Sequence, residues 1–559
     1  MINFNEKEQE KKLIEIRRAE EEDLAQILSQ KYQIPYLDLL GIPVNPNALM
    51  IMPEEDARGS GLAIFSIAGK NISVALLSPE NKKTSLVLEQ LKEQGYKPSL
   101  FIVSRKSLEK VWDRYKELTF GHVSQAGVLD ISNDDIEKYI KEIKTIDGVR
   151  DLIHKIISLE KNKRVTQVIE VILAGGLILE ASDVHIEPEE NIIKIRMRLD
   201  GVLINIADLD RETYKLLLSR IKLVSGLKIS RNENSQDGRF SIRVQKNEIE
   251  IRTSTLPSEY GESIAMRILN PETIALPLEK LGMDELLMET VEKEIKKPNG
   301  MILNTGPTGS GKTTTLYALL KKIYTTDIKI ITIEDPIEYH LPGITQTQVE
   351  NEKGYTFGKG LVSSLRQDPD VIMVGEIRDK ETAETAINAS LTGHLVLSTL
   401  HTNAASGTFP RLIDLGVKPQ MLGSSINLAM AQRLIRRLCV YCKKNVPTDQ
   451  QTTETIKRIL EEIKQKDPRR KIPSWDNKSV FISVGCEKCN QTGYKGRSGI
   501  FEAIILDENI EDIIRTNPSE REIEKAFSKQ RILSMRQDGI IKVLEGITDM
   551  NELQRVIEL

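Results

Sequence analysis

One short segment limits what this chain can fold into. Residues 306 to 313 read Gly-Pro-Thr-Gly-Ser-Gly-Lys-Thr and fit the phosphate-loop pattern GxxxxGK[ST]. The apolar run 301 to 303 before it predicts a strand, and residues 314 to 323 after it favour a helix. Glycines after a strand let backbone N–H groups turn around a phosphate at the positive N-terminus of a helix. The segment therefore predicts that the chain binds a nucleoside triphosphate.

Two side chains of this segment have specific expected roles. Lys312 supplies a positive charge for the β- and γ-phosphates, and Thr313 offers a hydroxyl to Mg²⁺. A glycine-rich turn that matches by chance is the alternative, but the flanking strand and helix and the complete Gly-Lys-Thr ending weigh against it. The residues expected to hold the nucleotide are Gly306, Pro307, Thr308, Gly309, Ser310, Gly311, Lys312 and Thr313.

The length and composition describe a multidomain protein without a general affinity for nucleic acid. A chain of 559 residues is too long for one core and predicts roughly three or four domains. The net charge of −4 and the aromatic content of 4% provide neither a basic groove nor a stacking surface for nucleic acid. We find no signal peptide and no apolar run near the ~20 residues that cross a bilayer. We therefore expect a cytoplasmic protein that meets the inner membrane only through partners.

Hydrophobic periodicity divides the chain into segments of α/β character. Strand patterns and helical patterns alternate after the phosphate loop, which is typical of a parallel sheet flanked by helices. Strands are also expected at 61–65, 72–76, 192–199, 240–244 and 249–255, and helical patterns at 13–31 and 134–144. The predicted segments are an N-terminal α/β domain at 1–118, a linker at 119–165, a second α+β domain at 166–272, and a nucleotide domain at 280–559 that includes a subdomain at 433–502 and C-terminal helices at 503–559.

Acidic residues follow two predicted strands of the nucleotide domain. The strand at 329–333 leads into Glu334-Asp335-Pro336-Ile337-Glu338, and the strand at 371–374 leads into Gly375-Glu376. Open α/β sheets bind ligands at this carboxyl edge. We therefore expect Glu334 and Glu376 to position Mg²⁺ and the attacking water, with Mg²⁺ held by Thr313 and by water bridges to Glu376. A solvated strand end is the alternative for each, and which of the two is the general base stays open.

Two of the six histidines flank one apolar strand in the same domain. His394 precedes the run 395–400 and His401 follows it. A sensor of the γ-phosphate or of domain closure and a simple core or capping role are equally compatible with this pattern.

All four cysteines of the chain occur in two CxxC pairs. Cys439 and Cys442 form one pair, and Cys486 and Cys489 form the other after 43 intervening residues. Tetrahedral Zn²⁺ binds four thiolates supplied as two such pairs, and four protein ligands leave no position for a substrate. We predict a structural zinc site, with buried free thiols or a redox pair as the alternatives.

Several independent motifs together resemble the secretion-superfamily ATPases of type II secretion and type IV pilus assembly. The phosphate loop, the Glu334 to Glu338 segment, the Leu365 to Asp379 segment and the Thr392 to Asn403 segment resemble the Walker A, Asp, Walker B and His boxes of that family. The resemblance spans about 165–559 and continues at 181–188, 198–201, 236–239, 254–257 and 496–502. Residues 1–118 resemble the platform-docking domain only loosely.

The resemblance implies a P-loop NTPase core with a RecA-like parallel sheet, a PAS-like second domain and a tetracysteine zinc subdomain. By the same resemblance, Arg252 and Arg267 are directed toward the phosphates of a neighbouring subunit, although an exposed strand charge is equally compatible with each. The family usually has Gly-Leu-Arg where this chain has Gly360-Leu361-Val362, so the role of that arginine is moved or absent here. The N-terminal domain lacks the Arg-Leu-Gly repeat that binds cyclic di-GMP in some relatives, and we do not predict that ligand.

The resemblance implies a homo-hexameric ATPase with ATP, Mg²⁺ and structural Zn²⁺ that moves an inner-membrane platform protein. Assembly of a type IV pilus is preferred over that of a type II secretion pseudopilus, and neither is excluded. A retraction motor is disfavoured, because those relatives resemble this chain without its N-terminal domain and tetracysteine segment. A regulator or scaffold that binds nucleotide without turnover is opposed by the two glutamates, and a nucleic-acid translocase is opposed by the composition.

Overall fold

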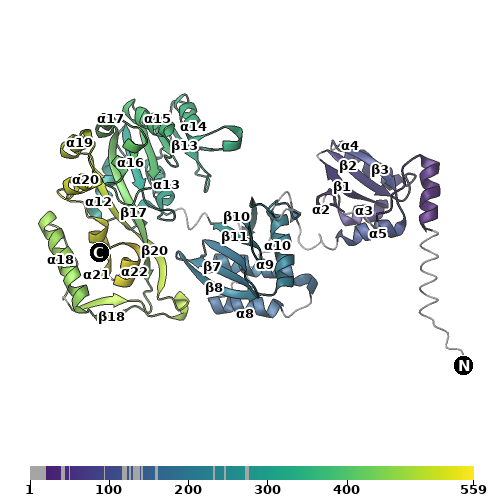
Figure 1. Cartoon of the computed structure of the whole chain (residues 1–559), viewed down its shortest axis with the longest axis horizontal. Coiled ribbons are helices and arrows are strands. Elements are labelled where there is room, and N and C mark those ends of the chain that lie inside the picture. The colour runs from purple at the N-terminus through teal and green to yellow at the C-terminus, as the bar shows by residue number, and fades with distance from the viewer. Residues whose placement is uncertain are drawn as a thin grey trace. The chain divides into compact units, whose positions relative to one another are not determined.

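The computed structural model divides into two compact units, residues 1–130 and 131–559 (Figure 1). The residues whose structure it describes are 21–39, 44–49, 51–68, 70–93, 95–115, 123–124, 128–129, 139, 143–157, 161–230, 233–244, 247–270, 276–476 and 478–559. Most of the helical pattern predicted at 134–144 and the first part of that at 13–31 lie outside these residues. Residues 21–32 are helical, as predicted.

The first unit is a small α/β domain with a three-stranded sheet. Strands β1 (Leu62–Ala68) and β2 (Asn71–Leu76) run antiparallel, and β3 (Lys97–Ile102) lies parallel to β2. Both strands predicted on either side of the turn near residue 70 are therefore confirmed. The helices are α2 (Pro46–Leu49), α3 (Glu54–Ser60), α4 (Lys82–Glu93) and α5 (Arg105–Asp113). The Trp112 indole of α5 donates to the Leu62 carbonyl at 3.1 Å and fixes this helix to the sheet.

The second unit begins with an antiparallel sheet and the helices that pack on it (Figure 1). Neighbouring strands follow the order β9, β10, β11, β6, β7, β8, and every pair is antiparallel. Apolar residues alternate along β7, so that one face is buried under the helices. The strands are β6 (Asp183–Pro188), β7 (Ile193–Leu199), β8 (Val202–Leu209), β9 (Gln236–Val244), β10 (Asn247–Ser258) and β11 (Gly261–Leu269), and the helices are α8 (Ile146–Ile157), α9 (Lys161–Ile178) and α10 (Arg211–Val224).

Helix α8 lies inside the range predicted as a linker. Val149 and Ile153 are buried, and Val149 packs against the neighbouring helix α9, where Gly175 approaches it closely. The second part of the predicted linker is thus an ordered helix with an apolar face, which a search for charge-rich stretches does not distinguish from a solvated segment.

The nucleotide domain contains the predicted parallel sheet. Its strand order is β14, β13, β15, β16, β12, β17, β20, and every neighbouring pair is parallel except β17 with β20. The strands are β12 (Gly300–Thr305), β13 (Ile330–Glu334), β14 (Thr345–Gln348), β15 (Val371–Val374), β16 (Leu395–Leu400), β17 (Ile426–Leu438) and β20 (Tyr494–Ile505). The helices between them are α13 (Lys312–Ile323), α14 (Phe357–Leu365), α15 (Lys380–Leu391), α16 (Thr408–Asp414) and α17 (Pro419–Ser425), with α12 (Glu285–Glu294) before the first strand.

An excursion and a helical tail complete this domain. Strands β18 (Lys444–Pro447) and β19 (Ser479–Ile482) pair antiparallel around helix α18 (Gln450–Lys466), between β17 and β20. The tail comprises α19 (Glu508–Arg515), α20 (Glu520–Phe527), α21 (Met535–Leu544) and α22 (Met550–Val556), which pack on the same apolar core as the sheet. Within the described part of the chain, no helix is both long and apolar enough to cross a membrane.

Candidate ATPase site and cysteine cluster

The phosphate loop joins the central strand β12 to helix α13. Strand β12 is completely buried, so the loop leaves the sheet at a fixed place on its carboxyl edge. Gly311 has φ of +90°, and a Cβ there would lie 2.8 Å from Gln432 Nε2. The loop therefore needs glycine at this position both for its backbone and for its close approach to strand β17. Pro307, Thr308 and Gly309 are exposed at the tip, where a ligand can approach.

Lys312 lies at the first position of helix α13, and its side chain hydrogen-bonds back to the phosphate loop. Its Nζ donates to the carbonyls of Gly306 at 2.8 Å and Pro307 at 3.1 Å. Burial lowers the pKa of Lys312, and the neighbouring Arg433 lowers it further, whereas Glu376 opposes this shift. The next residue, Thr313, is exposed, so its hydroxyl is accessible beside the loop.

Glu376 and His401 come together at the ends of two neighbouring parallel strands. His401 Nε2 lies 3.1 Å from Glu376 Oε2, and Arg378 pairs with the other carboxylate oxygen. Strand β16 holds the end of β15 in place, because the Thr399 hydroxyl donates to the Gly375 carbonyl at 2.7 Å. The Glu376 side chain is only 13% exposed but lies close enough to affect Lys312. A carboxylate and an imidazole thus lie beside the phosphate loop.

Glu334 occupies a different environment from Glu376. It is 2% exposed at the end of β13 and accepts hydrogen bonds from Thr332 at 2.5 Å, from Gln346 at 3.0 Å and from the Tyr317 hydroxyl. Burial raises the pKa of Glu334, and the three hydrogen bonds oppose that increase. Because Tyr317 belongs to α13, this network connects the carboxylate to the helix that begins at the phosphate loop.

The two predicted arginines have different surroundings. Arg252 on β10 donates to Glu338 Oε2 at 3.0 Å and to the Ile337 carbonyl, so it contacts the acidic segment of its own chain. Arg267 on β11 is 58% exposed and donates to Asp183 at 3.3 Å. Of these two arginines, only Arg252 hydrogen-bonds to the nucleotide domain among the described residues.

His394 is separate from these groups. Its Nδ1 lies 3.1 Å from the Ala389 carbonyl at the end of α15, at the opposite end of β16 from His401. Of the two histidines considered from the sequence, only His401 lies with the site, and His394 caps a helix.

Sequence reasoning missed two residues of β17 next to the loop. Gln432 is 1% exposed and accepts from Asn304 at 2.9 Å and from Thr315 at 2.8 Å, and Arg433 follows it. The available signal was a polar pair that follows the mostly apolar run 426–431 and interrupts strand β17 in its middle. That run gave no indication that its strand would lie beside β12.

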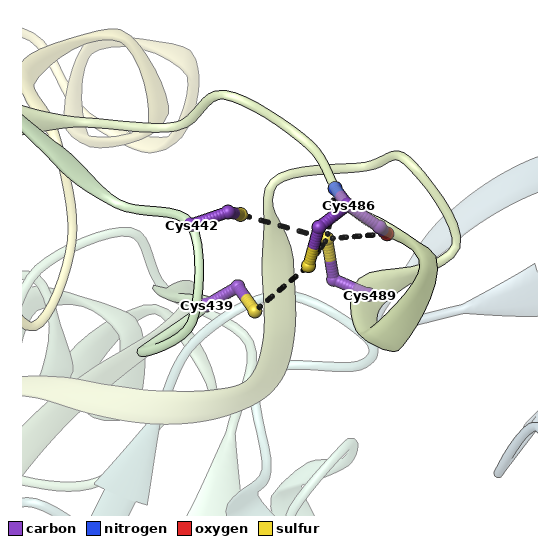
Figure 2. Close-up of side chains that lie close together, drawn as sticks. All are labelled: Cys439, Cys442, Cys486 and Cys489. Atoms are coloured by element: carbon purple, nitrogen blue, oxygen red, sulfur yellow. Dashed lines mark hydrogen bonds between the residues drawn. The ribbon is translucent and has the colours of Figure 1, made fainter.

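The four cysteines form one compact cluster (Figure 2). Their sulfur atoms all lie within 4.8 Å of one another, with neighbours such as Cys439 and Cys486 at 3.8 Å. Tetrahedral ligation with Zn–S bonds of ~2.3 Å requires sulfurs ~3.8 Å apart, whereas a disulfide requires ~2.0 Å. Backbone N–H groups of Cys486 and Gly493 also donate to the Cys489 sulfur, at 3.2 and 3.3 Å. The cluster could hold zinc.

Comparison with known proteins places this arrangement in a family. The model described as "Type II/IV secretion system protein" matches residues 158–555, and that of the MshEN domain matches residues 32–122. Type II secretion system protein E of Aeromonas hydrophila is 44% identical over 451 residues, which cover 79% of this chain and 86% of the relative. The type IV pilus assembly ATPase PilB of Myxococcus xanthus is 34% identical over 97% of this chain and 92% of its own length.

A solved structure of another ATPase shares this fold. The solved structure of the ATPase DotB of Legionella pneumophila aligns with a TM-score of 0.50 over 71% of this chain and 97% of its own, at 22% identity. The length of the family match and the identity to relatives over most of their sequences decide the assignment. The chain belongs to the Type II/IV secretion system protein family and is an ATPase.

Proposed function

We propose that this chain is a hexameric ATPase that drives assembly of a type IV pilus through an inner-membrane platform protein. The observation that carries the proposal is the grouping of the phosphate loop, Glu376 and His401 at one carboxyl edge of the sheet. The similarity to PilB over 97% of this chain supports the pilus. Type II secretion is the second candidate, because the 44% identity to the Aeromonas hydrophila protein supports it.

In this proposal, the residues of the loop exchange internal contacts for contacts to phosphate. The Lys312 ammonium leaves the carbonyls of Gly306 and Pro307 and binds the β- and γ-phosphates, while backbone N–H groups of the loop surround them. Thr313 and Glu376, the latter through water, would hold Mg²⁺, which neutralises charge on the transferring phosphoryl group.

Glu376 orients the attacking water, and its contact with His401 holds the carboxylate in position. Glu334 is better suited to a positioning role, since its oxygens already accept three hydrogen bonds in a buried network. Arg252 and Arg267 would bring positive charge from the second domain when the ring closes around the nucleotide.

We also propose that the four cysteines hold one structural Zn²⁺ per chain. Two ligands follow β17 and two precede β20, so the ion would close the excursion that carries α18. The protein would act in the cytoplasm and reach the membrane through the platform protein. Residues 1–118 are the proposed docking domain for that protein.

ATP hydrolysis by the purified chain tests the enzymatic part. Wild-type protein should release phosphate from ATP with Mg²⁺, and Lys312→Ala should fall to background because the loop loses its cation. Lys321→Ala is the matched control, since this lysine lies on the same helix and is exposed. Nucleotide binding without any turnover by the wild-type ring would instead support a regulator.

Complementation tests the biological part. The gene should restore pili, counted by electron microscopy, to a host that lacks its pilus assembly ATPase. Restored protein secretion in a host lacking its type II secretion ATPase, with no pili, would favour the second candidate. Mass photometry of the ATP-bound protein should find six chains per particle.

A further inference from the structure

Arg433 lies at the nucleotide edge of the strand next to the phosphate loop. Strand β17 runs parallel to β12, with Ala431 opposite Thr305. Arg433 lies two residues beyond this last paired position, where β12 has ended and the phosphate loop has begun. Because β17 continues past the end of β12, Arg433 lies at the carboxyl edge of the parallel sheet, the edge that also carries Glu376 and His401.

The backbone of this strand is held against the loop. A Cβ on Gly306 would lie 2.6 Å from the Gln432 carbonyl, which shows how closely the two segments approach. The Gln432 side chain is buried and bonded to Asn304 and Thr315, one on each side of the loop. Arg433 is therefore attached to a part of the strand that cannot move independently of the loop.

The guanidinium of Arg433 is only partly satisfied. Its Nη2 donates to the backbone oxygen and to Oδ1 of Asn403, both at 3.2 Å. Its Nη1 is buried and has no hydrogen-bond partner among the described residues. A buried N–H group of a cation without an acceptor is costly, so an acceptor that is not part of this chain would be stabilising there.

The local charge favours an anion as that acceptor. Arg433 and Lys312 are close enough for the arginine to lower the pKa of the lysine, and burial lowers the pKa of both groups. The acidic groups near these two cations already have other partners: Glu376 pairs with Arg378 and His401. Glu502, which opposes the lowering of the Arg433 pKa, accepts from the backbone N–H groups of Ala405 and Met535. Two partly buried cations beside a phosphate loop thus lack a full set of negative partners.

We propose that Arg433 binds the phosphate groups of the nucleotide together with Lys312, reaching them from strand β17. Its planar guanidinium can donate a hydrogen bond from Nη1 to a phosphate oxygen while Nη2 keeps its hydrogen bonds to Asn403. Asn403 follows His401 by two residues, so the arginine would connect the nucleotide to the segment that holds the histidine. This inference rests on the proposed function, since it adds a residue to the same site.

Binding measurements on the full chain test this role. Calorimetry with Mg²⁺ would compare ATP in its nonhydrolysable imido form, ADP and adenosine, in wild-type protein, Arg433→Gln and Arg433→Lys. A hydrogen bond to a charged group predicts that Arg433→Gln weakens the two phosphorylated ligands by roughly 10-fold to 100-fold. Adenosine affinity should be unchanged, and Arg433→Lys should lose less than Arg433→Gln because it keeps the charge.

Arg437→Gln is the matched control, because Arg437 lies on the same strand and is exposed. Equal affinity of wild-type, Arg433→Gln and Arg437→Gln proteins for ATP and ADP would overturn the proposal. An equal loss for all three ligands, adenosine included, would also overturn it, since the effect would then be a general distortion. If Arg433→Gln does not fold, the comparison between wild type and Arg433→Lys decides: unchanged affinity for the phosphorylated ligands contradicts the proposal.

The experiments distinguish a failure of the Arg433 proposal from a failure of the proposed ATPase function. Wild-type protein that neither binds nor hydrolyses ATP would contradict the function itself. Wild-type turnover with no phosphate-specific effect of Arg433→Gln would contradict only the role of Arg433.

Discussion

The His401 imidazole lies 3.1 Å from the Glu376 carboxylate, although 25 residues separate them in the chain. His401 directly follows the last residue of β16, Glu376 lies two residues beyond the last residue of β15, and the two strands are parallel neighbours. The pair therefore exists because the sheet aligns two carboxyl ends beside the phosphate loop.

Glu376→Gln should keep nucleotide affinity within a few-fold and lower turnover by at least ~100-fold, because the amide cannot orient or deprotonate water in the same way. Calorimetry and phosphate release measure the two quantities. Glu384→Gln, on the exposed side of α15, is the control. A wild-type rate in Glu376→Gln would make the assignment wrong.

The ion pair between Arg252 and Glu338 should couple the second domain to turnover. Arg252→Met and Glu338→Gln should each reduce ATP hydrolysis. Expressed as a free energy, the loss of activity in the double variant should be smaller than the sum of the losses in the two single variants. A double-mutant cycle on turnover is expected to give an interaction of about 1 kcal/mol. Lys194→Met, which changes another ion pair of the same domain, should be additive with Glu338→Gln. Full additivity of the Arg252 and Glu338 changes would contradict the coupling.

Arg267 gives a test of action between subunits, since 58% of its side chain is exposed. Arg267→Ala should bind nucleotide almost normally but turn over slowly, because an arginine matters most where transition-state charge is greatest. Mixing Arg267→Ala with Lys312→Ala should restore part of the activity, as each variant supplies the half that the other lacks. Mixed rings that are proven to co-assemble and stay inactive would exclude a contribution from the neighbouring subunit.

Purified protein should contain about one Zn²⁺ per chain by elemental analysis. Cys486→Ser should bind zinc less well, because three thiolates hold it more weakly than four. Hydrogen exchange should then increase across residues 433–502, while Lys488→Ala should leave zinc content and exchange unchanged. Protein prepared without chelators that contains no metal would contradict the zinc site.

Stability should depend on pH through Lys466 on helix α18. Burial lowers the pKa of Lys466 to about 8 in the folded protein, with Arg470 adding to the shift and Glu502 opposing it. Between pH 8 and the higher pKa of the unfolded chain, the unfolded state binds more protons, so stability rises with pH. Lys466→Met should melt above wild type at pH 7.5, and this difference should shrink toward pH 10.

Differential scanning fluorimetry measures that comparison at each pH. Lys464→Met, two residues away and exposed, should follow the wild-type profile. A melting difference between Lys466→Met and wild type that stays constant from pH 7.5 to pH 10 would show that Lys466 is charged in the folded protein throughout.

The sequence by itself determined the features that depend on neighbouring residues. The phosphate loop was predicted because its glycines, its lysine and its flanking strand and helix lie within one short segment. The alternation of strands and helices likewise predicted the parallel sheet, since apolar residues recur at a different spacing in a helix than in a strand. The grouping of four cysteines followed from two local pairs with complementary chemistry.

The tertiary structure decided what depends on distant contacts. Glu334 and Glu376 both follow apolar strands, but only packing against Tyr317 and Gln346 buries the first, while the second remains beside Lys312. The place of Arg433 depended on which strand would lie next to β12. Such pairings are set by the burial of whole strand faces, and no local pattern in a single sequence records which faces will meet.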